Sequence, residues 1–224
     1  MMTFTNILVA VSAIVAAYLI GSINFAVIFS GIFTGRDVRK SGSGNAGTTN
    51  VMRTAGLLPG ILTFVFDAAK GFVGAFIGKT VFSYLFGLTG LSVFTSIYGA
   101  YICYVFVMIG HILPIFFQFK GGKGIATSVG GFAVCCWPAI VIGLCAFAIS
   151  VIITKIVSLG SMIATIFVVT FAIVFVDTSV GVIPQIVMAI IAGGIVVYTH
   201  RTNIVRLIHG EEKKLTIGRG KKNG

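Results

Sequence analysis

Three short segments of this 224-residue chain gather glycines, hydroxyl or amide side chains and cations, which are the groups that bind phosphate and other anions. The first segment runs from Arg39 to Arg53 and reads RKSGSGNAGTTNVMR. Its glycines free the backbone to turn N–H groups inward, and cations stand at both ends. A flexible loop without a ligand is the alternative when this segment is taken alone. The residues that we expect to contact an anion here are Gly42, Ser43, Gly44, Asn45, Asn50 and Arg53.

The second segment, Lys120 to Thr127 (KGGKGIAT), stands where one apolar stretch ends and another begins. Glycines at a helix N-terminus expose unpaired backbone N–H groups, and the side chain of Lys123 adds a full positive charge, so an anion is favoured there. A nucleotide-binding P-loop requires Ser or Thr after its lysine. The segment is therefore not a P-loop, because a glycine follows Lys123. Its candidate site residues are Gly121, Gly122, Lys123 and Gly124.

The third segment, His200 to Arg206 (HRTNIVR), follows the last apolar stretch. On a continuing helix the side chains of His200 and Asn203 share one face, because they are three residues apart. An imidazole can act as a general base near neutral pH, so this polar pair is a catalytic candidate. Anchoring to lipid headgroups is the alternative for each arginine of the segment, and we keep Arg201 as a candidate for substrate binding.

Membrane helices must position these three segments. The chain is 57% hydrophobic and only 9% charged, and its mean hydropathy is +1.09, whereas a soluble domain carries roughly a quarter charged residues. The apolar runs are long and continuous, without the alternation of a barrel strand, and this favours a helical bundle. We therefore expect one all-α integral membrane domain over residues 1–224.

Seven transmembrane helices give the most consistent distribution of charge. Residues 125–154 form either one long helix or two short ones that meet at Trp137-Pro138. With two helices, fourteen of the sixteen Lys and Arg fall on one side of the membrane, in agreement with the positive-inside rule. This choice places the N-terminus outside and the C-terminus in the cytoplasm. The expected spans are about 7–33, 58–82, 91–117, 125–136, 138–154, 156–176 and 183–199.

Ionisable residues inside the spans are few. Asp67 and Lys70 stand at i, i+3 in the second span and are expected to form an ion pair, whereas His111 is expected to be packed or interfacial. The chain has only five Asp and Glu, and none of them is spaced beside the four cysteines, so we expect no metal and no cofactor. Most of the net charge of +11 follows from the positive-inside rule, whereas the clustered cations of the three segments indicate anionic partners at the membrane surface. We expect membrane lipid and small molecules, with no nucleic acid and no obligate protein partner.

The three segments resemble the motifs of the bacterial acyl-phosphate:glycerol-3-phosphate acyltransferase family. The matching residues are GSGNAGTTNVMR (42–53), GGKGIAT (121–127) and HRTNIVRLIHGEE (200–212). The resemblance implies a seven-helix enzyme of the bacterial inner membrane whose active site faces the cytoplasm. Such an enzyme transfers a fatty acyl group from acyl phosphate to the sn-1 hydroxyl of glycerol 3-phosphate. Its products are lysophosphatidic acid and phosphate, in the first acylation step of phospholipid synthesis.

The same resemblance implies roles for individual residues. Ser43 and Arg53 match phosphate and substrate contacts of the first motif, Lys123 matches the lysine of the second, and His200 with Asn203 matches the polar pair of the third. The family also uses a serine between the second and third motifs. The segment VSLGSM offers Ser158 and Ser161 for this role, and Ser161 is preferred although Gly160 departs from the Ser-rich pattern.

Two questions stay open at this point. The proton of the acceptor hydroxyl goes either to His200 or to a phosphate of a substrate. An anion or phosphate-compound transporter is the alternative function, because glycine-broken helices and the Asp67–Lys70 pair lie within the membrane. Against a transporter, the three anion-binding segments fall on one membrane face, and no inverted repeat is visible.

Overall fold

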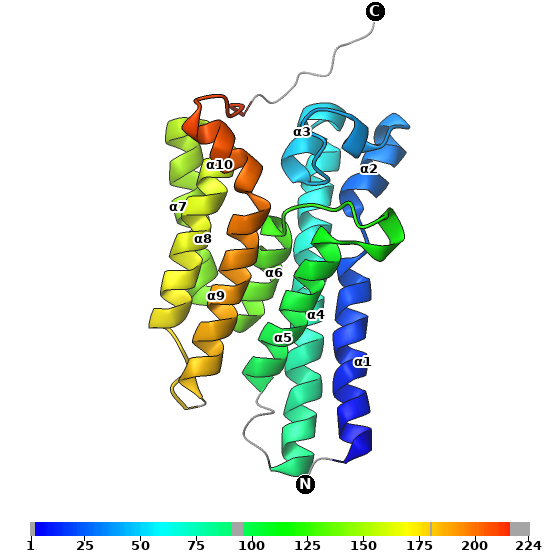
Figure 1. The fold of residues 1–224 in the computed structure, drawn as a ribbon, viewed down its shortest axis with the longest axis vertical. Coiled ribbons are helices and arrows are strands. Elements are labelled where there is room, and N and C mark those ends of the chain that lie inside the picture. Colours follow the sequence, from blue (N-terminus) through cyan, green and yellow to red (C-terminus); the bar gives the residue numbers. More distant parts are fainter. Residues whose placement is uncertain (1–2, 91–95, 180, 216–224) are drawn as a thin grey trace, which may run out of the picture.

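The structure, a computed structural model, describes residues 3–90, 96–179 and 181–215. Within these ranges the chain forms helices and turns and no strand. The long helices run side by side along one axis, and α3 and α10 lie together at one end while α1 begins at the other (Figure 1). The helices are α1 (Phe4–Gly21), α2 (Phe25–Thr34), α3 (Thr48–Ala55), α4 (Leu57–Thr89), α5 (Ser96–Ile112), α6 (Ile125–Cys135), α7 (Trp137–Thr154), α8 (Val157–Val174), α9 (Val182–Thr199) and α10 (Arg201–Ile208), with 3₁₀ turns at Val38–Lys40 and Ile115–Phe117.

Six segments of the described chain are long and apolar enough to cross a membrane. The prediction of an all-α integral membrane protein is thereby confirmed. Residues 125–154 form two helices, as the charge distribution predicted, and α7 begins with Pro138 in its first turn, where a missing N–H costs nothing. The expected spans 125–136, 138–154, 156–176 and 183–199 agree with α6, α7, α8 and α9 to within two residues. Of these, α6 is an apolar helix of 11 residues and is shorter than a full span.

The other three expected spans, 7–33, 58–82 and 91–117, correspond to the segments Phe4–Thr34, Leu57–Thr89 and Ser96–Phe117, and their helices differ in detail. The first, 7–33, is two helices, because the side chain of Asn24 accepts a hydrogen bond from the N–H of Val27 (3.2 Å) and starts a new helix there. The second, 58–82, continues to Thr89, where Gly90 ends it in a left-handed conformation. The third, 91–117, is helical only to Ile112, after which the chain turns at Pro114; its predicted start, 91–95, lies outside the described residues.

Glycines allow α4 and α6 to touch through their backbones. A Cβ atom added to Gly71 of α4 would lie 2.1 Å from the carbonyl oxygen of Thr127, and one added to Gly130 of α6 would lie 1.8 Å from that of Ala68. Neither position tolerates a side chain without moving a helix. The contact encloses the short α6 among its neighbours, as in other membrane bundles that use small residues at helix interfaces.

An ion pair lies inside the bundle, as predicted. Lys70 Nζ lies 2.7 Å from Asp67 Oδ1, and the two side chains are 3% and 1% exposed. Lys70 also donates to the carbonyl oxygen of Ile23 at the break between α1 and α2 (2.7 Å), which that break leaves without a helical partner. His111 is buried, with Nδ1 3.5 Å from the same carboxylate oxygen, so the prediction of a packed histidine is confirmed. These contacts give Asp67, Lys70 and His111 a structural role.

We expect Lys70→Met to lower the free energy of unfolding by about 3–5 kcal/mol, because it leaves the carboxylate of Asp67 buried without its cation. Asp67→Asn combined with Lys70→Met should recover at least half of that loss, since no isolated charge remains. Equilibrium unfolding in detergent measures both, with Lys79→Met as the matched control on an exposed position of the same helix. A double variant as unstable as Lys70→Met would contradict this account of the pair.

Candidate active site

Loop 1, defined here as residues 36–47, is built around the side chain of Asn50. The amide nitrogen of this buried residue donates to the carbonyl oxygens of Val38 (3.1 Å), Ser41 (3.0 Å) and Asn45 (3.0 Å). Its amide oxygen accepts the N–H of Ser43 (2.9 Å). Asn50 was predicted to contact an anion, but its side-chain hydrogen bonds instead hold the shape of loop 1.

Loop 1 exposes a serine between two left-handed glycines. Gly42 and Gly44 have φ angles of +65° and +74°, a conformation that side chains disfavour, and the exposed Ser43 lies between them. The backbone N–H of Asn45 lies 3.5 Å from Ser43 Oγ. Arg53, in the last turn of α3, is half-buried, and no hydrogen bond or ion pair of its guanidinium is found among the described residues. An unpaired cation on the helix that follows this glycine turn suits an anionic ligand.

Loop 2, defined here as residues 113–124, lies against the end of α5 and against loop 1. The N–H groups of Gly121 and Gly122 donate to the carbonyl oxygens of Ile112 and His111, each at 3.1 Å. A Cβ atom on Gly122 would lie 2.2 Å from His111 Nε2 and 2.5 Å from the carbonyl oxygen of Ala46. These two glycines therefore permit close packing of the loops, and their N–H groups are not free for a ligand.

The N-terminus of α6 is open toward an anion. Gly124, with φ +85°, precedes the helix and no side chain caps its first turn. Backbone N–H groups in an uncapped first turn, together with the helix dipole, favour negative charge. Lys123 lies directly before this helix start. The uncapped start of α6 beside Lys123 is the geometry expected of an anion-binding helix N-terminus.

The second and third segments meet through Lys123. Its ammonium group donates a hydrogen bond to the side-chain oxygen of Asn203 on α10, which is 80 residues away in the sequence. The hydroxyl of Thr199 donates to the backbone oxygen of Lys123 (3.1 Å) and ties the end of α9 to loop 2. Burial, and then the positive charge of Arg206, lower the pKa of Lys123 to about 8. The amine therefore changes charge within the working pH range of an enzyme.

Glu212 connects α10 with α8, and the sequence analysis did not select it. Its Oε1 accepts hydrogen bonds from Asn203 Nδ2 and Ser158 Oγ, and its Oε2 accepts one from Arg206 Nε, each at 2.7 Å. Burial opposes the charge, but these three hydrogen bonds outweigh it and lower the pKa of Glu212. The carboxylate thereby fixes the amide of Asn203, so its oxygen faces Lys123. The sequence feature that could have identified Glu212 is the rarity of acidic residues, because it is one of only five in the chain.

His200 is buried at the junction of α9 and α10. Its Nδ1 lies 2.8 Å from the carbonyl oxygen of Val196, so this nitrogen carries the hydrogen and Nε2 keeps its lone pair. Burial lowers the pKa of His200 to about 4, and the charge of Lys123 acts in the same direction. The imidazole is therefore neutral near pH 7, with Nε2 available to accept a hydrogen bond.

The structure does not bring every predicted residue to this place. Arg201 is exposed, donates to the carbonyl oxygen of Tyr198 (3.2 Å) and stacks over that ring at 4.6 Å. Ser158 lies in the Glu212 network, whereas the preferred Ser161 donates to the carbonyl oxygen of Val157 (3.0 Å) one turn further along α8. Arg201 therefore lies at the surface with Tyr198, and the two serines occupy different surroundings.

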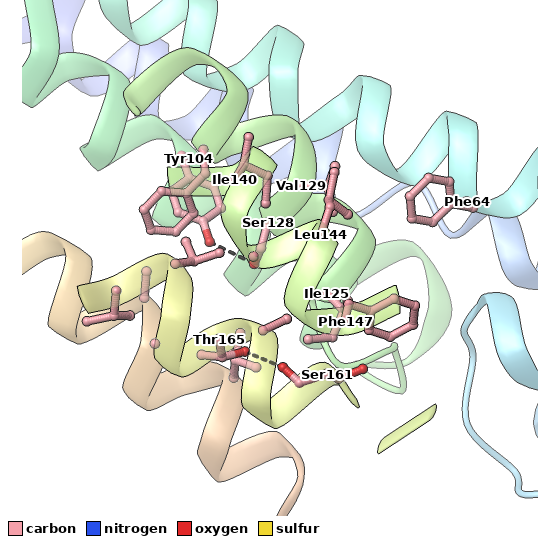
Figure 2. A pocket seen from close by; sticks show the side chains of 18 residues that line it. Phe64, Tyr104, Ile125, Ser128, Val129, Ile140, Leu144, Phe147, Ser161 and Thr165 are labelled. Carbon is pink, nitrogen blue, oxygen red and sulfur yellow. Dashed lines mark hydrogen bonds between the residues drawn. The ribbon is translucent and has the colours of Figure 1, made fainter. Parts of the chain in front are cut away.

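An apolar pocket begins beside these groups and runs into the bundle between α6 and the helices α7, α8 and α9 (Figure 2). Its cavity volume is about 120 Å³. Ser161 and Ile125, which follows Lys123 by two residues, line it, and the hydroxyl pair of Tyr104 and Ser128 (2.7 Å) is one of its few polar features. An amphiphilic anion fits this combination, with its charged end among the cations and its apolar part in the pocket.

The fold is that of an integral membrane protein, and its cations and apolar pocket suit an amphiphilic anion. Residues 11–210 match the family described as glycerol-3-phosphate acyltransferase, and the chain belongs to this family. The family membership that the three motifs predicted is thereby confirmed.

Relatives and solved structures cover nearly the whole chain. The glycerol-3-phosphate acyltransferase of Francisella tularensis subsp. mediasiatica (strain FSC147) is 40% identical over 204 residues, which is 91% of this chain and 92% of that protein. The protein of the same name from Thermoanaerobacter sp. (strain X514) is 40% identical over 210 residues, 92% and 96% of the two chains. The crystal structure of PlsY (YgiH), an integral membrane glycerol 3-phosphate acyltransferase, in its glycerol 3-phosphate form has a TM-score of 0.79 at 33% identity and covers 92% of this chain and 96% of that one. Its lysophosphatidic acid form has a TM-score of 0.76 at 32% identity, covering 92% and 94%.

Proposed function

We propose that this chain transfers a fatty acyl group from acyl phosphate to the sn-1 hydroxyl of glycerol 3-phosphate and releases lysophosphatidic acid and phosphate. The observation that carries the proposal is the contact between Lys123 and Asn203, which joins two motifs of the family beside the apolar pocket. One substrate is a small phosphate ester and the other is an amphiphile. A cluster of cations and amides next to an apolar pocket suits both of them.

The chemistry requires positioning more than covalent catalysis. Acyl phosphate is an activated mixed anhydride, so the hydroxyl oxygen of glycerol 3-phosphate can attack its carbonyl carbon directly. The new ester bond forms as the bond from the carbonyl carbon to the phosphate oxygen breaks, and phosphate leaves. Lys123 and Arg53 stabilise the negative charge on the two phosphates and on the carbonyl oxygen. Ser43, Asn45 and the glycines of loop 1 form the proposed cradle for one phosphate, and the start of α6 the cradle for the other.

A substrate phosphate is the favoured acceptor of the hydroxyl proton. The pKa of His200 is lowered to about 4, so its Nε2 is a weak base at neutral pH. A phosphate monoester has its second pKa at about 6 and is therefore the stronger base. His200 Nε2 instead accepts a hydrogen bond from the sn-2 hydroxyl and orients the substrate, which leaves the proton of the attacking sn-1 hydroxyl to the phosphate.

The donor is proposed to be acyl phosphate because the chain lacks the His-x4-Asp arrangement of acyltransferases that use coenzyme A or a carrier protein. Five residues after the three histidines stand Phe116, Val205 and Lys214. Acyl phosphate is itself a lipid-like anion, so its tail is proposed to reach the apolar pocket from within the bilayer.

The experiment that tests the function uses purified protein in detergent with palmitoyl phosphate and glycerol 3-phosphate, without metal or coenzyme A. We expect lysophosphatidic acid and phosphate in equal amounts. Lys123→Ala should reduce turnover by about a hundredfold, because preorganised charge of this kind is worth roughly that much. A folded preparation without turnover at any acyl chain length would contradict the proposal, and phosphate uptake into sealed vesicles would then identify the transporter instead.

Lys123 should limit activity at high pH. Its pKa is lowered to about 8, and only the charged amine attracts phosphate, so kcat/KM should fall as the pH rises through about 8. Lys123→Arg should lack this decline, because a guanidinium stays charged beyond about pH 12. Steady-state rates from pH 6 to about 10, corrected for spontaneous hydrolysis of the donor, measure both profiles. An unchanged alkaline limb in Lys123→Arg would assign the titration to another group.

The apolar pocket is proposed to hold the first part of the acyl tail. It follows α8 from Ser161 to Val168, a rise of about 10 Å at roughly 1.5 Å per residue. An extended acyl chain advances by about 1.3 Å per carbon, given a C–C bond near 1.5 Å, so about eight carbons fit. Ala192 lines the deeper half of the pocket, one turn below Val196 on α9.

We expect Ala192→Leu to fill this deeper half and to disfavour long donors. The ratio of kcat/KM for dodecanoyl phosphate to that for butyryl phosphate should fall by at least about tenfold, since each displaced methylene is worth about 0.8 kcal/mol. Ile191→Phe, which enlarges an exposed neighbour on the same helix, is the matched control and should leave the ratio unchanged. An equal loss for both donors would mean that the tail binds elsewhere.

We also propose the seven-helix topology and its orientation, with one membrane domain over residues 1–224. Helices α1 and α2 together cross the bilayer once, and α4 to α9 supply six more passes, with the short α6 shielded by its neighbours. The basic segments at one end of the bundle support a cytoplasmic active site in the inner membrane.

Labelling of single cysteines in a variant without the native ones tests the orientation. We expect Thr178→Cys, in the exposed turn between α8 and α9, to react with an impermeant maleimide in intact cells. Lys40→Cys, exposed in loop 1, should react only after the membrane is opened, because its end of the bundle faces inward. The reverse pattern would place the site outside the cell.

A further inference from the structure

Loop 2 contains a turn that its own residues do not favour. Gln118 and Phe119 have φ angles of +58° and +56°, in the left-handed region that is unfavourable for residues with a side chain. Two such residues in succession persist only where surrounding contacts hold them in place. Both side chains are exposed, so packing of these side chains does not supply the contacts.

Arg39 of loop 1 supplies contacts on both sides of this turn. Its Nη1 donates to the carbonyl oxygen of Phe117 at 2.7 Å and lies 3.5 Å from that of Lys120. These carbonyl groups directly flank the two left-handed residues. The guanidinium also lies 6.0 Å from the centre of the Phe117 ring. A charged donor shared between the flanking carbonyl groups stabilises the turned backbone, since charge-assisted hydrogen bonds are the strong ones.

Asp37 holds the guanidinium of Arg39 in this position. Its Oδ2 accepts from Nη2 (2.7 Å) and Nε (3.0 Å), and its Oδ1 accepts from Nε (3.1 Å) and from the backbone N–H of Arg39 (2.9 Å). These hydrogen bonds use the fork of the guanidinium and leave Nη1 pointing at loop 2. The carboxylate thus fixes the direction of the one nitrogen that crosses between the loops.

We infer that Asp37 and Arg39 are positioning residues that hold the strained turn of loop 2 and thereby set the place of Lys123 opposite Asn203. Lys123 follows Phe119 by four residues, and α5 anchors the glycines between them from the other side. Neither Asp37 nor Arg39 needs to touch a substrate for this role. The kinetic part of the test relies on the proposed acyl transfer, and the exchange measurement below does not.

The kinetic test compares two arginines of the same loop. We expect Arg39→Gln to lower kcat/KM by about tenfold or more with a melting temperature close to that of the parent, because Lys123 loses its alignment. Arg36→Gln, which removes the same charge from an exposed position without a side-chain partner among the described residues, should retain the parent rate. Equal rates for the two variants would overturn the inference.

A second pair of substitutions separates positioning from direct substrate binding. Gln118→Asn with Phe119→Gly places residues that tolerate a left-handed backbone in the turn. Added to Arg39→Gln, it should restore kcat/KM to within about threefold of the parent, and alone it should change little. Failure to restore the rate would show that Arg39 acts on the substrate or through its charge, and would overturn the inference. If Arg39→Gln does not fold, Asp37→Asn replaces it with the same expected rescue.

Hydrogen exchange gives a readout that needs no turnover. Amide protons of residues 117–124 should exchange faster in Arg39→Gln than in the parent, because the turn opens more often. The turn substitutions should slow the exchange again, and Arg36→Gln should not affect it. Unchanged exchange in Arg39→Gln would overturn the inference. A parent protein without acyl transfer but with this exchange pattern would contradict the proposed function and leave the positioning role intact.

Discussion

The hydrogen bond between Lys123 and Asn203 is the contact on which the rest of the site depends. It joins the start of α6 to α10, two elements that the sequence separates by 80 residues. Around it, Glu212 orients the amide of Asn203 and Thr199 holds the backbone of Lys123. Burial lowers the pKa of the Lys123 amine. A bound anion would raise this pKa again, because a nearby negative charge favours the protonated amine. The contact thus fixes the position of the Lys123 amine, and the surroundings of the contact set the charge of that amine.

At the break between α1 and α2 the bundle meets the constraint of low polarity with an ion pair. The charges of Asp67 and Lys70 neutralise each other, and the ammonium group also satisfies the carbonyl oxygen of Ile23. Inside a bilayer an unpaired charge or backbone group is expensive, so these contacts are needed before a site can exist. Close backbone contact at Gly71 and Gly130 lets the short α6 stand among longer helices with its N-terminus toward the site.

Much of this arrangement could be predicted from the sequence. Composition predicted the membrane class, the asymmetry of Lys and Arg predicted the division of residues 125–154, and the i, i+3 spacing predicted the pairing of Asp67 with Lys70. Composition, charge asymmetry and residue spacing can all be measured on the sequence itself, so they do not require knowledge of the tertiary structure. The motif residues Lys123 and Asn203 were selected for the same reason, because each motif is contiguous.

The features that the sequence did not predict depend on where the chain doubles back. Glu212 reaches Asn203 only because the chain turns after α10, at Gly210 with φ +71°. Asn50 and the N–H groups of Gly121 and Gly122 were expected to face an anion, but they bond to neighbouring backbone whose position is set by tertiary structure. The break at Asn24 was visible as a polar interruption, yet an interruption alone does not distinguish a helix contact from a new helix start.

The most direct test of the central claim is a double-mutant cycle on kcat/KM with Lys123→Met and Asn203→Ala. If the two side chains act as one unit, the double variant should lose little more activity than the worse single variant, so that the product of the single losses overestimates it by at least about tenfold. Losses that simply multiply would show that Lys123 and Asn203 act independently, and would contradict a site assembled through their contact.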